Sequence, residues 1–159
     1  MTTTEEIRDI FSILHDGVIS AWNGDKDLLT LTVDCEYLAE RIDKSFDKFY
    51  VELLEIDKIE LDPWSTPSDL QTAIKVNIPD IFKAELEILS TEIKNKEVVI
   101  TCNQHDREFD YIGGNLTISC QNIKIFDQNK TELTINHFHK ICKDYWDEWS
   151  KNKSAYNTG

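Results

Sequence analysis

The sequence predicts an α+β fold: an antiparallel β-meander of about six to eight strands in one curved sheet, with an N-terminal helix and a C-terminal amphipathic helix packed on it. Near both ends of the chain, apolar residues recur every three or four positions, which is typical of amphipathic helices. Between these segments, short runs alternate apolar and polar residues, as strands with one wet face do. The connections are too short for parallel crossovers, so we expect antiparallel pairing.

The N-terminal helix is predicted over residues 4–15. Thr3 and Glu6 have the spacing of a capping box, and Gly17 ends the helix. Its apolar stripe consists of Ile7, Ile10, Phe11 and Leu14. A hairpin follows, with strands at 18–22 and 29–35 joined by a polar turn. Residues 37–41 fit either a helical turn or an ordered connection.

The alternation resumes at 49–53 and 59–61, with a bend expected at 55–58. Two prolines in the segment 62–68 predict a loop there, because proline removes a backbone donor and disfavours helix before it. Residues 70–78 fit either a helix or a strand.

Strands are predicted at 86–93 and 97–103 around a polar turn, and at 116–125 with a β-bulge at 121–122. Gly113-Gly114-Asn115 is the strongest hairpin-turn signal, because glycine accepts the positive φ that such turns require. A further turn is expected at 127–130.

The closing helix is expected to begin at an Asn136 cap and to end near Lys151. Its apolar stripe consists of Phe138, Ile141, Cys142, Tyr145 and Trp149. Residues 1–153 are predicted to form a single α+β domain, and 154–159 a frayed C-terminal tail.

The composition excludes some classes of function. Among 159 residues there are 17 basic and 30 acidic ones, and the net charge is −13. This field repels phosphates, which argues against general nucleic-acid binding and against binding to an anionic membrane. Residues 1–64 hold six of the basic and sixteen of the acidic residues. No signal-peptide pattern or apolar run of about 20 residues is present, so a cytoplasmic location is expected.

The sequence offers little for catalysis, and no cofactor is expected. The four cysteines form no CxxC pair and are interpreted as small core residues. Only His139 and Cys142 could share one ion on the closing helix, and two ligands do not make a zinc site, so no metal is expected. His15 is interpreted as a cap of the first helix. Nucleophile-elbow and phosphate-loop motifs are absent from the sequence.

A noncatalytic module that binds a basic protein partner is therefore the leading hypothesis. In size and charge the chain is similar to the small acidic immunity proteins of bacteria, although this resemblance covers no diagnostic motif. The candidate contact residues are Asp25, Asp27, Asp34, Glu36 and Trp146. Tryptophan is enriched at binding hot spots, and Trp146 lies off the apolar stripe as a partly exposed anchor.

Two alternatives remain open. The first is an enzyme or small-ligand binder that uses a pocket between the sheet and the closing helix, with His15, His137 or His139. The second is a homo-oligomeric structural subunit, joined through an exposed strand edge or the tryptophan-bearing helix.

Overall fold

The computed structural model describes residues 1–65 and 73–157, and it confirms the predicted α+β class. The helices are α1 (Thr3–Ile13), α2 (Glu36–Ala39), α3 (Ile78–Ile81) and α4 (Ile135–Asn157). The strands are β1 (Val18–Gly24), β2 (Leu28–Asp34), β3 (Lys48–Ser65), β4 (Leu86–Lys94), β5 (Glu97–Asn103), β6 (Tyr111–Phe126) and β7 (Glu132–Leu133). None of the helices in the described part of the chain combines the length and the apolar character that a membrane span requires.

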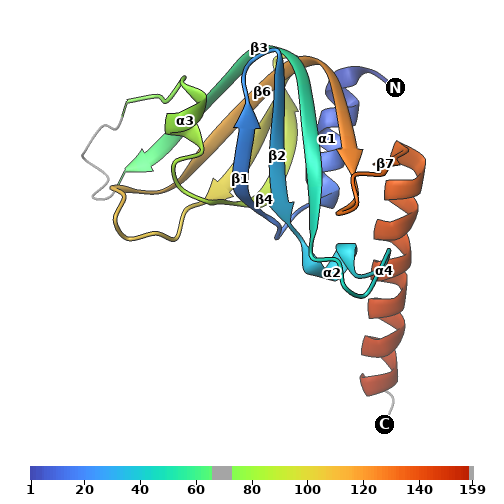
Figure 1. Ribbon diagram of the computed structural model, residues 1–159. Coiled ribbons are helices and arrows are strands. Elements are labelled where there is room, and N and C mark those ends of the chain that lie inside the picture. Colours follow the sequence, from blue (N-terminus) through green and yellow to red (C-terminus); the bar gives the residue numbers. More distant parts are fainter. Residues whose placement is uncertain (66–72, 158–159) are drawn as a thin grey trace.

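The seven strands form one antiparallel sheet in the order β3-β2-β1-β4-β5-β6-β7. Strand β3 also pairs with β6 along almost its whole length, so the curved sheet closes on itself (Figure 1). Helix α1 lies against β4, β5 and β6, and α4 contacts both α1 and α2. Alternate side chains of the strands and the apolar face of α1 form one buried core.

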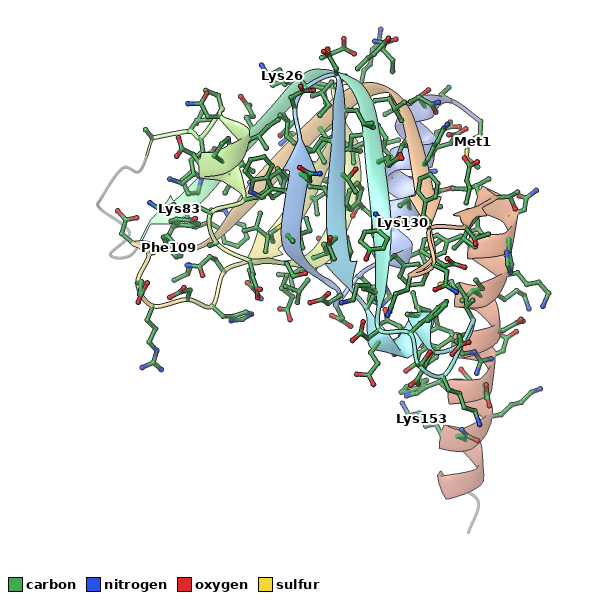
Figure 2. All side chains as sticks on the ribbon, viewed as in Figure 1. Met1, Lys26, Lys83, Phe109, Lys130 and Lys153 are labelled. Atoms are coloured by element: carbon green, nitrogen blue, oxygen red, sulfur yellow. The ribbon has the colours of Figure 1, made fainter. Side chains whose placement is uncertain are left out.

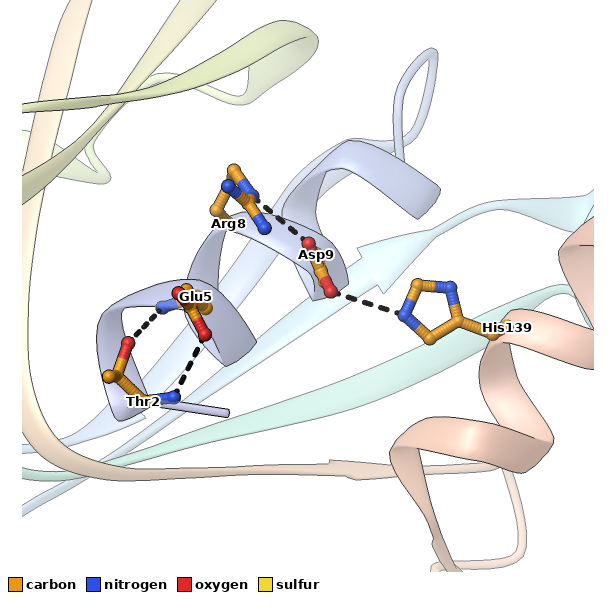
Figure 3. A network of polar contacts seen from close by, with 5 residues as sticks. All are labelled: Thr2, Glu5, Arg8, Asp9 and His139. Atoms are coloured by element: carbon orange, nitrogen blue, oxygen red, sulfur yellow. Dashed lines mark hydrogen bonds and ion pairs between the residues drawn. The ribbon is translucent and has the colours of Figure 1, made fainter.

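Helix α1 begins one residue earlier than the sequence predicts. The capping box is formed by Thr2 and Glu5, not by Thr3 and Glu6: the Thr2 hydroxyl accepts the Glu5 N–H at 3.2 Å, and the Glu5 carboxylate accepts the Thr2 N–H at 3.0 Å. Both threonines precede a glutamate by three residues, so spacing alone does not distinguish them. Figure 3 shows this box together with Asp9, which lies 3.2 Å from His139 and links α1 to α4.

Strand β3 is longer than predicted. The expected bend at 55–58 is a bulge inside one continuous strand: Glu55 has a φ of 50°, and the register with β6 shifts between Ile56 and Lys58. The predicted loop at 62–68 is wrong for its first four residues, because Pro63 lies in β3 opposite Gly114. Residues 66–68 of that prediction lie outside the described residues.

The predicted turn at Gly113-Gly114-Asn115 is wrong. These residues lie inside β6, and the connection between β5 and β6 is the segment 104–110. A Cβ on Gly113 would collide with the Cys102 carbonyl oxygen and approach the Trp64 ring to 3.1 Å. The glycine therefore permits close packing of strands and not a reversal of the chain.

The predicted bulge at 121–122 lies in the partner strand instead. Strand β6 keeps its register with β3 from Asn122 to Cys120, and the extra residue is Asp57 of β3. The alternation of buried and exposed side chains nevertheless changes phase at Gln121. A shift in the alternation of apolar and polar residues indicates that the pairing of two strands is irregular. It does not indicate which of the two strands has the extra residue.

The sequence leaves alternatives open for two segments, 37–41 and 70–78, of which the structure describes 37–41 and 73–78. Residues 37–41 contain most of α2, which is the helical alternative. In the segment 70–78, Lys75 forms an isolated bridge with Leu61, and Ile78 begins α3. Residues 70–72 lie outside the described part.

Helix α4 also differs from the prediction at both ends. Thr134, not Asn136, supplies the capping oxygen, which accepts the His137 N–H at 3.1 Å. The helix continues to Asn157 instead of ending near Lys151, and its second half extends beyond the sheet (Figure 1). Fraying of 154–159 stays a prediction, and residues 158–159 lie outside the described part.

Candidate functional site

The four predicted acidic contact residues lie in two separate places. Asp25 and Asp27 belong to the turn between β1 and β2, whereas Asp34 ends β2 and Glu36 begins α2. A strand rises about 3.4 Å per residue, so the seven residues of β2 hold the two pairs roughly 20 Å apart. The four carboxylates therefore do not form one compact group, and only Asp34 and Glu36 lie at the α2 end of the sheet.

The predicted anchor, Trp146, belongs to a group of aromatic rings at this same end. Its ring stacks on His15, with centroids 5.5 Å apart and planes at 16°, and meets Tyr37 edge-on at 6.3 Å. Tyr145 and Trp149 contact it at 5.0 and 5.6 Å. We call these five residues the aromatic cluster: they come from α2, α4 and the residue after the α1 C-cap. Trp146 is partly exposed.

Hydrogen bonds fix the position of His15 in this cluster. Its Nδ1 donates to the Ser12 carbonyl oxygen at 2.8 Å, which confirms the predicted capping role at the end of α1. The Tyr37 hydroxyl donates to the His15 carbonyl oxygen at 2.6 Å. The Tyr37 ring in turn contacts Tyr145 at 4.8 Å, so one tyrosine joins the end of α1 to the middle of α4.

Trp149 differs from its predicted place on the buried stripe. Its side chain is 45% exposed, because α4 has passed beyond the sheet at this level (Figure 1). The Lys153 ammonium lies 5.0 Å from the ring centroid, a cation–π contact one helical turn further on. Two tryptophans three residues apart among acidic residues were the available signal in the sequence, because such a pair shares one helix face.

Charged side chains of both signs lie at the aromatic cluster. The Asp16 side chain is 66% exposed and lies next to His15, and Glu36 is exposed at the start of α2. Glu148 forms an ion pair with Arg41, which joins α2 to α4. An exposed pair of this kind contributes little to stability. The cluster thus has Asp16 and Glu36 near it as exposed carboxylates, together with the Arg41–Glu148 pair and the Lys153 ammonium.

Burial raises the pKa of all four cysteine thiols. Cys35, Cys102 and Cys120 are buried, as predicted for core cysteines, and Cys142 is partly buried. Burial raises the pKa of the Cys35 and Cys102 thiols to about 12 and that of Cys120 to about 11. Burial also raises the pKa of the Tyr37 hydroxyl. Because a nucleophilic cysteine must react as the thiolate, these protonated thiols are poor candidates for catalysis.

The three histidines considered for catalysis have separate environments. His15 belongs to the aromatic cluster, and His139 pairs with Asp9. His137 lines a cavity of about 410 Å³ between α2 and α4, together with Arg41 and Asp144. Within residues 1–65 and 73–157, no three His, Cys, Asp or Glu side chains form a group that could hold a metal ion.

Comparison of the chain with protein-family models, curated proteins and solved structures finds no match.

Proposed function

We propose that the protein is a noncatalytic interaction module that binds a basic protein partner through the aromatic cluster and the carboxylates around it. One observation carries this proposal: rings from three parts of the chain meet at one end of the molecule, and Trp149 remains nearly half exposed there. Tryptophan and tyrosine supply a large share of binding energy at protein interfaces.

The charge of the chain supports a basic partner. A net charge of −13 attracts a positive protein over a distance, and Asp16 and Glu36 place negative charge beside the rings. Carboxylates at such a border raise association rates and exclude acidic competitors. A partner that itself binds nucleic acid fits this chemistry, because carboxylates can occupy the places of phosphates. This would be the mode of action of an immunity protein that masks a toxin.

The test uses the protein as bait and compares variants. Wild type, Trp149→Ala and Asp16→Asn are immobilised, and proteins retained from the source cell at low salt are identified and purified. For the purified partner, we expect Trp149→Ala to weaken binding by roughly tenfold or more, as a hot-spot truncation does. Asp16→Asn should mainly slow association, and this effect should shrink as salt rises.

Matched controls lie on the hairpin between β4 and β5. Ile93→Ala removes an exposed apolar side chain and Glu92→Gln an exposed carboxylate. Glu92 and Ile93 lie four and five residues along β4 from Ile88, whose carbonyl oxygen accepts the Asp16 N–H, and therefore roughly 15 Å from that end of the molecule. Both controls should bind the partner like wild type. If no retained protein is basic, or if the purified partner binds Trp149→Ala as tightly as Ile93→Ala, the proposal is wrong.

A further inference from the structure

A second concave surface lies between the β1–β2 turn and the segment that leads into α3. It is open to solvent and has a volume of about 530 Å³, within the range of small-molecule sites. Its apolar lining includes Trp22, Val76 and Pro79. Val76 is 54% exposed, so a large part of this apolar side chain has no protein neighbour. Buried aliphatic groups of a ligand would therefore find an apolar surface here.

The polar lining of this cavity is dominated by two carboxylates, Asp25 and Asp80, with Lys26 as the one basic residue of the lining. The Oδ1 atom of Asp25 accepts the N–H groups of Asp27 at 2.9 Å and Leu28 at 3.3 Å. Among the residues that the structure describes, its Oδ2 has no hydrogen-bond partner, and neither Asp25 nor Asp80 has an ion pair. Within the described chain, neither carboxylate thus has a basic side chain within ion-pair distance.

We propose that this cavity binds a small organic cation, a guanidinium or ammonium group on a short apolar stem. An indole attracts cations through its π face, and carboxylates are the usual partners of guanidinium groups. The stem would contact Val76 and Pro79, while Trp22, Asp25 and Asp80 would surround the charge. The lining has two carboxylates and one ammonium group, that of Lys26, so its net negative charge disfavours an anionic ligand.

This site goes beyond the proposed function, because it is separate from the aromatic cluster. Figure 2 shows Lys26 at the β1–β2 turn and Lys153 near the far end of α4, at opposite ends of the molecule. A cation bound beside Lys26 would therefore not touch the rings of the cluster, and either proposal can fail while the other holds.

The test compares two probes of the same shape, n-butylguanidinium and the uncharged n-butylurea. Binding is followed by the indole N–H signal of Trp22 in a heteronuclear NMR titration. We expect n-butylguanidinium to bind with a dissociation constant on the order of 1 mM, the range for a ligand of this size. Binding of n-butylurea should be at least about tenfold weaker, because it lacks the charge.

Charge-removing variants locate the site. Asp25→Asn keeps an Oδ1 acceptor for the turn, so the fold of the hairpin is retained while the charge is lost. Asp25→Asn and Asp80→Asn should each weaken n-butylguanidinium binding by about three- to tenfold, and Lys26→Gln should strengthen it.

The matched control is Asp27→Asn, which removes the neighbouring turn carboxylate that is not part of the cavity lining. It should change the affinity by less than about twofold, because the Asp27 carboxylate does not line the cavity and would not contact the bound cation. Equal binding of the two probes would overturn the proposal, as would an equal effect of Asp27→Asn and Asp80→Asn.

Discussion

Helices α1 and α4 have similar apolar patterns in the sequence, but their apolar stripes are buried to different extents in the structure. The stripe of α1 is buried along the whole helix: Ile7 and Ile10 are 2% exposed, and Phe11 is 0% exposed. Helix α4 has 23 residues, and exposure rises along it from Phe138 at 0% to Trp149 at 45%. A helical pattern shows which side of a helix is apolar, whereas burial requires that the rest of the molecule reaches that side.

The difference also separates two uses of aromatic side chains. Phe138 meets Phe49 edge-on at 5.3 Å inside the core, where its burial contributes to stability. Trp149 packs on one ring and leaves much of its surface in water, so its contribution to folding is small. Such a residue is free to contribute to binding instead.

Truncating one aromatic residue in each half of α4 tests this comparison most strongly. Phe138→Ala should lower the free energy of unfolding by about 3–5 kcal/mol, because it removes a fully buried ring. Trp149→Ala should lower it by less than about 1 kcal/mol. Urea unfolding of both variants measures the difference. Similar losses in the two variants would show that the outer half of α4 is packed as firmly as the inner half.

Adding a methyl group to the closed sheet extends the comparison. Gly113→Ala should destabilise the protein by about 1–3 kcal/mol, because the new Cβ collides with the Cys102 carbonyl oxygen. A substitution to alanine on the exposed outer half of α4, Ser150→Ala, should leave the stability unchanged or raise it by about 0.5 kcal/mol, because alanine favours helix. Thermal unfolding of both variants gives the sign. A neutral Gly113→Ala would mean that β5 and β6 can separate at this point without cost.

Thiol reactivity distinguishes α4 from the buried core. At pH 8 a thiol reagent should modify the partly exposed Cys142 of α4 at least about 100-fold faster than Cys35, Cys102 or Cys120, whose thiols are buried and protonated. Labelling followed by mass spectrometry of peptides identifies the order. Labelling of Cys102 at the rate of Cys142 would contradict the closed sheet.

The raised thiol pKa values also make stability depend on pH in one direction. Below pH 9 the thiols are protonated in both states, and the stabilisation is fully present. Between pH 9 and about 12 the unfolded chain loses a proton that the folded Cys102 keeps, so the free energy of unfolding falls. The expected slope is about 1.4 kcal/mol per pH unit for each such thiol. Between about pH 9 and 10.5, the free energy of unfolding of Cys102→Ala should therefore fall less steeply with pH than that of wild type. The difference corresponds to one proton, about 1.4 kcal/mol per pH unit.

The smallest effect is expected from the exposed ion pairs of α4. Lys143 lies 2.7 Å from Asp147, one helical turn away, and both side chains are more than half exposed. Lys143→Gln should therefore change the free energy of unfolding by less than about 0.5 kcal/mol, and high salt should remove even this difference. A loss of more than 1 kcal/mol would show that this face of α4 is ordered by contacts beyond the pair.

Only some residues of the candidate site could be predicted from the sequence. Trp146 and its acidic neighbours stand out because aromatic and acidic residues alternate along one helix. His15 and Tyr37, which complete the aromatic cluster, come from segments more than a hundred residues away and have no pattern that links them to Trp146. The predicted acidic group is separated by the length of β2, a separation that the predicted strand at 29–35 already implies. Convergence of distant residues depends on tertiary packing.

The sequence by itself determined the α+β class, the positions of most strands, the two amphipathic helices and the buried cysteines. These features depend on local periodicity and burial preference, which neighbouring residues carry. Only the tertiary structure decided that β3 pairs with β6, that Gly113 lies within a strand and that Trp149 is exposed. Each of these depends on which distant surface faces a residue, and a glycine or a tryptophan has the same local preferences in either setting.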